Sequence, residues 1–258
     1  MQNKRPLIMV CNDDGIFAPG IRTLIECVKT LGDVVVVAPD RGQSGMGHAI
    51  TIGDVVRLEK VSEEEGIIEF KCSGTPVDCV KLGVSHVVDR KPDLLVSGIN
   101  HGANNSINVI YSGTMSAAVE GAMESMPSIG FSYCDFGYDN DYSHLKPYII
   151  KLCQNALSND FPRHTCLNVN FPHVAPNEIK GMKICRQAEA YWKDSFEKRV
   201  DPSGKEYYWL TGNFENRDKG QDTDVHALSQ GYVSIVPVQY DLTAHHAMSD
   251  FNAWDYEI

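Results

Sequence analysis

Near the start of the chain stands the stretch Leu7-Ile8-Met9-Val10-Cys11-Asn12-Asp13-Asp14-Gly15. Its first five residues are apolar or nearly so, which predicts a buried strand of a parallel sheet. Asp13 and Asp14 follow where this strand ends, and ligands of open α/β sheets bind in the crevice outside the carboxyl ends of the strands. Two adjacent carboxylates repel each other, and a hard divalent cation would offset that repulsion. The alternative is that Asn-Asp-Asp-Gly is only a turn.

The residues that follow alternate between helical and strand patterns. Apolar spacing predicts helices, and buried runs predict further strands. The predicted helices cover 20–30, 76–87, 114–126 and 145–157, and the predicted strands cover 7–11, 33–38, 93–97, 128–133 and 166–171. Thr75 is a predicted N-cap with Asp78 at the capping-box spacing. This alternation predicts an α/β fold with a doubly wound, mostly parallel sheet.

The pattern changes in two places. Residues 49–58 and 67–72 are expected to form short strands, and after Pro172 two strands over 184–192 and 206–211 are expected to flank the polar stretch 193–205. The aromatic residues of this arm favour a subunit contact over a ligand pocket. A short helix over 222–229, a last strand over 231–236 and a tail over 239–258 follow. We therefore expect a single domain, 1–258, with a core (1–172) and a region (173–258) of hairpin arm, last core strand and tail.

Composition excludes several classes of protein. The chain has 258 residues and a formal charge of −11, which argues against binding to a nucleic-acid polymer. No apolar run approaches the ~18–20 residues that span a bilayer, so no membrane association is expected. The eight cysteines include no Cys-x-x-Cys pair. They are typical of buried thiols in a reducing compartment, which predicts a cytoplasmic location.

Polar residues follow several strands at the edge where the strands end. Asp13 and Asp14 supply carboxylates, Ser44 a hydroxyl and Asn100 a side-chain carbonyl oxygen. Such a set suits Mg²⁺, Mn²⁺ or Ca²⁺ better than zinc, which prefers sulfur and nitrogen. His101, next to Asn100, is either a pocket residue or an ordinary solvated histidine.

A fourth loop, Ser112-Gly113-Thr114, stands at the start of the helix predicted from 114. The N–H groups of Gly113 and Thr114, together with the hydroxyls of Ser112 and Thr114, would face an anion there. A cation site and an anion site across one crevice favour a bound phosphate ester.

Five blocks resemble the stationary-phase survival protein SurE family in order and spacing. They are Val10-Cys11-Asn12-Asp13-Asp14-Gly15, Ala38-Pro39-Asp40-Arg41-Gly42-Gln43-Ser44-Gly45, Gly74-Thr75-Pro76-Val77-Asp78-Cys79-Val80, Val96-Ser97-Gly98-Ile99-Asn100-His101-Gly102-Ala103-Asn104 and Tyr111-Ser112-Gly113-Thr114-Met115-Ser116-Ala117-Ala118. The similarity continues into 231–235. Cys11, Ala103 and the stretch Met46-Gly47-His48 depart from the usual pattern, and none is a proposed ligand.

The resemblance implies a Rossmann-like core and a 5′-nucleotidase that hydrolyses nucleoside 5′-monophosphates, and also 3′-monophosphates, with one divalent metal ion per subunit. It also implies a homodimer or homotetramer built through the C-terminal hairpin and tail. Carried over by position, Asp13, Asp14, Ser44 and Asn100 would bind the metal, and Asn104 and the turn 112–114 would bind phosphate.

The mechanism has two alternatives at this point. Either a water activated by the metal attacks phosphorus, with Asp13 or Asp14 taking its proton, or an aspartate attacks directly. A non-catalytic metal- or nucleotide-binding module is the alternative function. Adjacent carboxylates argue against a haloacid-dehalogenase-like phosphatase, whose pattern is Asp-x-Asp. The absence of Gly-x-Gly-x-x-Gly in the first turn argues against a nicotinamide dehydrogenase.

Overall fold

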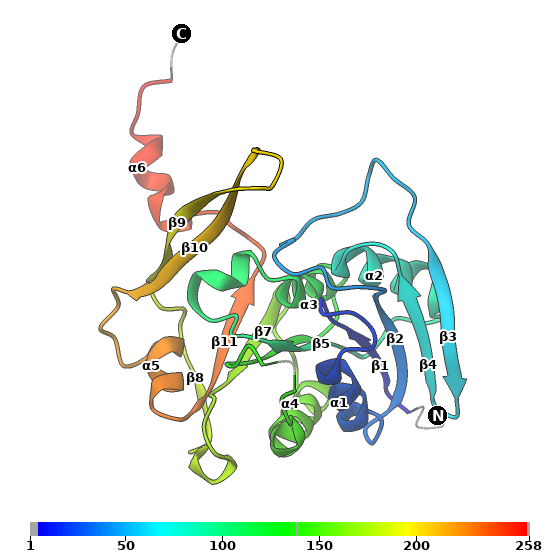
Figure 1. The fold of residues 1–258 in the computed structure, drawn as a ribbon. Helices are drawn as coiled ribbons and strands as arrows, with labels where there is room; N and C mark the ends of the chain where they lie inside the picture. Colours follow the sequence, from blue (N-terminus) through cyan, green and yellow to red (C-terminus); the bar gives the residue numbers. More distant parts are fainter. Residues whose placement is uncertain (1–4, 138, 257–258) are drawn as a thin grey trace.

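A nine-stranded sheet forms the centre of the computed structural model, which describes residues 5–137 and 139–256 (Figure 1). Its strands are β1 (Leu7–Cys11), β2 (Asp33–Pro39), β3 (Leu58–Glu64), β4 (Ile67–Cys72), β5 (Leu94–His101), β6 (Ser128–Tyr133), β7 (Thr165–Phe171), β8 (Met182–Ile184) and β11 (Val233–Gln239). They lie in the order β3-β4-β2-β1-β5-β6-β7-β11-β8. The six strands from β4 to β7 are parallel, whereas β3 and β11 run antiparallel to β4 and β7. The predicted mostly parallel α/β sheet is confirmed.

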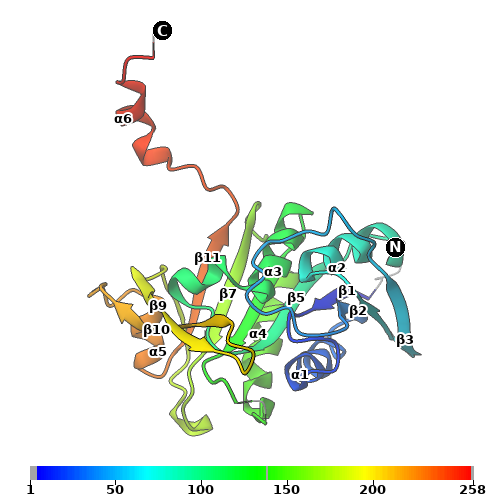
Figure 2. The same cartoon turned by 45° about the horizontal axis from the view of Figure 1, so that its top comes forward.

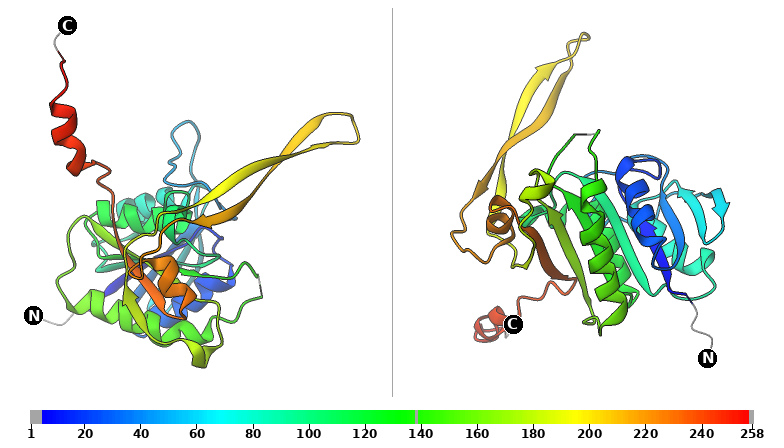
Figure 3. Two further views of the ribbon diagram at one scale, coloured as in Figure 1. Left: turned by 90° about the vertical axis from the view of Figure 1, so that its left-hand side faces the viewer. Right: turned by 90° about the horizontal axis from the view of Figure 1, so that it is seen from below.

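Helices cover both faces of this sheet. In Figure 1, α1 (Pro19–Val28) and α4 (Lys146–Ser158) lie below it, and α2 (Pro76–Leu82) and α3 (Gly113–Met123) lie above it. Ile21, Leu24 and Val28 form the buried side of α1 and pack in the core between α1, α4 and the sheet. Figure 3 shows α1 and α4 side by side on one face. The sheet is thus doubly wound, as expected.

The order of strands reverses at β1. The chain passes from β1 to β2 on one side, and β5 later pairs with β1 on the other side. Such a reversal opens a crevice at the carboxyl ends of the two central strands. Helix α1 approaches the end of β5 closely, because a Cβ on Gly20 would lie only 2.0 Å from the carbonyl oxygen of Ile99. The crevice therefore lies beside Asp13 and Asp14, which follow β1, and beside Asn100, near the end of β5.

The C-terminal hairpin differs from its predicted bounds. Its strands are β9 (Ala190–Val200) and β10 (Glu206–Asn216), so the stretch 193–200, predicted as a loop, belongs to a strand. Both faces of the distal hairpin are exposed, and polar cross-strand contacts such as Ser195 Oγ with Thr211 Oγ1 (2.8 Å) join it. The distal hairpin residues therefore lack the alternation of apolar and polar residues that predicts a half-buried strand. Figure 3 shows the hairpin extending beyond the sheet.

The predicted strand over 49–58 is also wrong. Residues 49–57 have no regular secondary structure, and β3 begins at Leu58. The polar groups of this segment are used by the start of α2: Thr75 Oγ1 donates to the carbonyl of Ala49 (2.7 Å), and Thr51 Oγ1 donates to Asp78 (2.6 Å). The predicted cap is confirmed, since Thr75 and Asp78 form a capping box.

Short elements complete the chain. The helical elements still to be named are α5 (Asp224–Ser229), α6 (Met248–Asn252), the π-helix η1 (Gly83–Val87), and the 3₁₀ turns η2 (Ser106–Ile110), η3 (Ser143–Leu145), η4 (Pro176–Glu178) and η5 (His245–Ala247). Figure 2 shows α6 projecting away from the rest of the molecule. None of the helices in the described residues has the length and apolar character that crossing a membrane requires. The cysteines are free thiols, and all except Cys134 are buried.

Candidate functional site

A cavity of about 430 Å³ opens at the carboxyl edge of the sheet. Five predicted site residues line it: Asp13, Ser44, Asn100, Asn104 and Ser112. They come from four separate segments, namely the ends of β1 and β5, the loop after β2 and the start of α3. The other three predicted residues, 14, 113 and 114, lie directly behind this lining, as their contacts below show.

Asp13 is the most buried charged group of the site, with 3% of its surface exposed. The hydroxyl and the backbone N–H of Thr114 both donate to its carboxylate. Burial, and then repulsion by Asp14, raise the pKa of Asp13 to about 6, although the bonds from Thr114 act in the opposite direction. The carboxylate is therefore held in place at a large electrostatic cost.

Asp14 contacts a histidine on the neighbouring strand. Its Oδ1 lies 2.8 Å from His101 Nδ1, and the backbone N–H of His101 lies 3.4 Å from Oδ2. Burial raises the pKa of Asp14 even though His101 opposes the rise. His101 also lines the cavity, so of the two interpretations of this histidine the structure favours the pocket residue.

Asn100 and Ser44 present neutral oxygens to the cavity. The side-chain amide of Asn100 donates to the carbonyl of Gly102 (2.8 Å), which leaves Oδ1 as the atom available to a cation. Ser44 is exposed in the loop that follows β2. The backbone N–H of its neighbour Gln43 donates to the carbonyl of Asp13 (2.7 Å), so this loop runs beside the first carboxylate.

The start of α3 packs against Asp13. Ser112 is the N-cap and its Oγ accepts from the N–H of Met115 (3.0 Å). A Cβ on Gly113 would lie 2.7 Å from Cβ of Asp13, so only glycine permits this approach. Thr114 was predicted to contact phosphate, but its hydroxyl is engaged by Asp13. The groups that remain for an anion are those of Ser112 and Gly113.

Asn104 is held by side chains of the neighbouring strands. Its N–H donates to Asn170 Oδ1 (2.7 Å), its Nδ2 donates to Ser132 Oγ (2.8 Å), and its carbonyl accepts from Asn168 Nδ2 (2.7 Å). Asn170 in turn donates to Asn168 (2.9 Å). Ser132, Asn168 and Asn170 were not predicted as site residues. Their polar side chains within apolar strands were a signal, because buried polar groups need hydrogen-bond partners.

The donor set fits a hard divalent cation. Asp13 and Asp14 are adjacent buried carboxylates whose pKa values are both raised, so a positive charge beside them would lower their free energy. Ser44 and Asn100 add only oxygen atoms at the same cavity, and oxygen is the ligand atom of Mg²⁺, Mn²⁺ and Ca²⁺. In the described part of the chain, no group of three or more His, Cys, Asp or Glu side chains is placed to hold a metal ion. Neutral oxygens and water would therefore complete this site.

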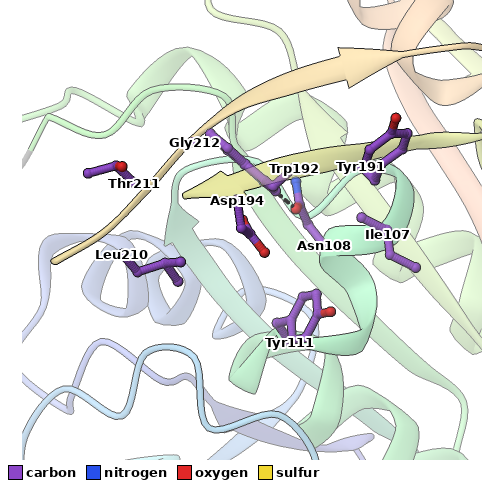
Figure 4. Close-up of a pocket in the computed structure, with 9 residues that line it drawn as sticks. All are labelled: Ile107, Asn108, Tyr111, Tyr191, Trp192, Asp194, Leu210, Thr211 and Gly212. Atoms are coloured by element: carbon purple, nitrogen blue, oxygen red, sulfur yellow. Dashed lines mark hydrogen bonds between the residues drawn. The ribbon is translucent and has the colours of Figure 1, made fainter. Parts of the chain in front are cut away.

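A second cavity of about 690 Å³ adjoins the first (Figure 4). It lies between the hairpin and η2, and both cavities share the residues Asn108, Tyr111 and Trp192. Trp192 Nε1 donates to Asn108 Oδ1 (2.8 Å), which fixes the indole over η2. The sequence favours a subunit contact for the aromatic residues of the hairpin arm, and Trp192 is one of them. Its place beside the site was missed because nothing local in the sequence indicates which strand faces the cavity.

The base of the hairpin is fixed to η2 by Asp224, which is fully buried. Its carboxylate accepts from the N–H groups of Ser106 (2.7 Å) and Ala188 (3.0 Å). The hydroxyl of Ser106 donates to the carbonyl of Ala190 (2.7 Å), the first residue of β9. The wall of the second cavity is therefore set by buried hydrogen bonds and not by the exposed strands alone.

The raised pKa of Asp13 has a consequence for stability. Between the ordinary value of 3.8 and about 6, the unfolded chain loses this proton before the folded protein does. Stability of the metal-free protein therefore falls as pH rises through this range, by up to roughly 3 kcal/mol. We expect Asp13→Asn to gain stability relative to wild type from pH 4 to 6.5, with a constant difference above. Urea unfolding in the presence of a chelator measures the free energy of unfolding, and the exposed Asp40→Asn variant is the control. A stability difference between Asp13→Asn and wild type that does not change with pH would contradict the prediction.

Comparison with known proteins places these residues in a family. The family described as "Survival protein SurE" matches residues 8–194. The chain is 58% identical over 255 residues to "5'-nucleotidase SurE" of Flavobacterium johnsoniae, covering 98% of both chains, and 44% identical to "5'-nucleotidase SurE" of Phocaeicola vulgatus, covering 100% of both. The crystal structure of the SurE protein from Aquifex aeolicus superposes with a TM-score of 0.81 at 39% identity and covers 96% of this chain and 98% of that one. The chain belongs to the SurE family.

Proposed function

We propose that this protein is a divalent-metal-dependent 5′-nucleotidase that hydrolyses nucleoside 5′-monophosphates, and also 3′-monophosphates, to nucleoside and phosphate. The observation that carries the proposal is the adjacent carboxylates of Asp13 and Asp14 at the end of β1. Asp13 is buried and lines one cavity with Ser44 and Asn100, and the side chain of Asp14, 7% exposed, lies behind that lining. Relatives named 5'-nucleotidase SurE support the substrate class.

Asp13, Asp14, Ser44 and Asn100 would hold one Mg²⁺ or Mn²⁺ ion, and Ca²⁺ has the same ligand preference. Such an ion supplies positive charge to the phosphoryl oxygens and an activated water at neutral pH. Thr114 fixes Asp13 through its hydroxyl, and His101 fixes Asp14 from the neighbouring strand. Both contacts keep the carboxylates oriented before substrate arrives.

The phosphate would lie in the first cavity beside Asp13, where Ser112 at the start of α3 also lines the wall. The hydroxyl of Ser112 and the N–H of Gly113 would donate to the anion there, because a helix N-terminus favours negative charge. Asn104 is fixed by its three hydrogen bonds and lines the same cavity, so it would contact the phosphate without a rearrangement. Asp13 or Asp14 would take the proton of the attacking water.

The second cavity would hold the base of the nucleotide. It adjoins the first cavity through Asn108, Tyr111 and Trp192, so a ligand with its phosphate in the first cavity reaches it directly. In Figure 4, Trp192 and Tyr111 lie on opposite sides of the space between the hairpin and η2. Aromatic side chains are stacking partners for any base.

We also propose a homodimer or homotetramer through the hairpin and tail, in the cytoplasm. Large apolar side chains are exposed there, among them Trp209 (58%), Leu210 (61%), Phe251 (50%) and Trp254 (62%). An exposed apolar surface of this extent on a projecting hairpin and helix favours a protein contact. Eight free thiols favour a reducing compartment.

Metal removal tests the activity. We expect phosphate release from AMP, GMP and 3′-AMP to stop in EDTA and to return with Mn²⁺ or Mg²⁺, and Asp13→Asn to lower it at least about 100-fold, since cation charge supplies several kcal/mol of transition-state stabilisation. Malachite-green assays measure this, with the exposed Asp160→Asn as control. A wild-type protein that binds Mn²⁺ and releases no phosphate would support the binding module instead, and near-normal turnover by Asp13→Asn would remove Asp13 from the mechanism.

The base cavity is tested by comparing two substrates. Trp192→Ala should raise KM for AMP at least about fivefold, because base stacking contributes ~1–3 kcal/mol. It should leave KM for ribose 5-phosphate unchanged, since that ester has no base. Lys193→Ala, on the same hairpin but outside the cavity lining and 71% exposed, serves as control. Equal changes for the two substrates would show that Trp192 does not contact the base.

The proposed association is tested by sedimentation velocity. The wild-type chain should sediment as a dimer or tetramer, and the double variant Phe251→Ser/Trp254→Ser should shift to a smaller species, because it removes the apolar side chains of the tail. His246→Ser, in the same tail, should sediment as wild type. A monomeric wild-type chain, or an unchanged mass in the double variant, would argue against a contact through the tail.

A further inference from the structure

The loop between β2 and β3 carries Ser44 in a segment that packs poorly. Residues 40–57 have no regular secondary structure, and Ser44 itself is exposed. Nothing lies within 4 Å of the place that a Cβ would take on Gly42 or Gly45, and Gly45 has a φ of +74°. The position of the Ser44 hydroxyl therefore depends on the contacts that hold the loop on either side.

Two backbone hydrogen bonds flank Ser44. The N–H of Gln43 donates to the carbonyl of Asp13 (2.7 Å), and the N–H of Gly47 donates to the carbonyl of Tyr111 (3.2 Å). The first bond joins the loop to β1, and the second joins it to the segment that precedes α3. A side-chain contact then follows at His48, whose Nε2 lies 3.0 Å from Glu120 Oε2.

Glu120 is a buried charge on α3 that joins the loop to two helices. It lies on α3 with 1% of its surface exposed, and Lys81 on α2 donates to its second carboxylate oxygen. Burial would raise the pKa of Glu120, but the hydrogen bonds from His48 and Lys81 outweigh burial and lower it. The carboxylate is therefore ionised and His48 is the donor. Loss of one partner destabilises a buried carboxylate, so the folded protein favours the contact between His48 and Glu120.

The position of Glu120 on α3 links the loop contact to the proposed phosphate site. Glu120 follows Gly113 by seven residues, which places it about two turns, or ~10 Å, from the helix N-terminus at the proposed phosphate site. The same helix thus carries the anion-binding end and the residue that holds the Ser44 loop. Beyond His48 the loop is fixed again, by Thr75 to the carbonyl of Ala49 and by Asp78 to Thr51.

We propose that His48 is a positioning residue for the cation site: through Glu120 and Lys81 it holds the loop so that the Ser44 hydroxyl faces the carboxylates. The proposal rests on the proposed function, because it takes Ser44 as a ligand of the metal. His48 does not line the cavity that holds Asp13, Ser44 and Asn100, so its effect would be transmitted by the loop alone. Groups that hydrogen-bond directly to a metal ligand typically contribute 10–100-fold to affinity. His48 acts on Ser44 through the loop, so we expect an effect at the lower end of this range.

The test uses the full-length protein with three single variants. His48→Ala removes the donor, His48→Gln keeps an N–H that reaches Glu120, and Ile52→Ala changes an 84% exposed residue of the same loop as control. Isothermal titration with Mn²⁺ alone should give a Kd at least about tenfold higher for His48→Ala, a near wild-type Kd for His48→Gln and no change for Ile52→Ala. Saturating Mn²⁺ should restore kcat of His48→Ala towards wild type.

Amide hydrogen exchange without metal gives a second readout that does not depend on the proposed chemistry. His48→Ala should speed exchange at 43–51 and leave β1 and α1 as in wild type. If wild type binds no Mn²⁺, the proposed function fails, and faster exchange at 43–51 would still establish the anchor. A Kd within twofold of wild type with unchanged exchange would overturn the role of His48. A general rise in exchange across the sheet would show that His48 acts on folding only.

Discussion

Burial of two adjacent carboxylates at the end of β1 is the constraint on which the rest of the site depends. Asp13 and Asp14 repel each other where little water can screen them, and burial raises the pKa of both. Contacts from elements distant in sequence partly offset this cost: Thr114 donates to Asp13, and His101 pairs with Asp14. Those contacts reduce the repulsion without removing it. The unfavourable charge that remains is the reason for proposing a cation at this site.

These contacts also bind the site to the sheet topology. Asp13 and Asp14 follow β1, His101 ends β5, and Thr114 lies in the first turn of α3. The cluster therefore forms only when β5 has paired with β1 and α3 has packed against the end of β1. Gly20 and Gly113 permit the close approach of α1 and α3, since a Cβ on either would collide with the site segments. The strand reversal at β1 therefore supplies both the crevice and the geometry of its residues.

The parts of the structure that the sequence could predict are those with buried apolar periodicity. Strands at 7–11 and 128–133 have their predicted bounds, because an apolar run between turn residues has few other interpretations. The hairpin is different: its distal faces are both exposed, so polar residues such as Lys193 are as frequent in its strands as in a loop. The side chains behind the site, such as Asn168, could not be assigned either, because hydrogen bonds between strands depend on register and not on local sequence.

The proposed ligands stand on both rigid and exposed parts of the chain. Asp13 and Asn100 end strands of the central sheet, and the helix N-terminus at Ser112 is buried, so packing fixes these groups. Ser44 alone stands on an exposed loop without regular structure. Under the proposed function, a change in this loop would alter cation affinity without altering the core. Substitutions in the residues that follow Ser44 would then change affinity and leave the carboxylate pair in place.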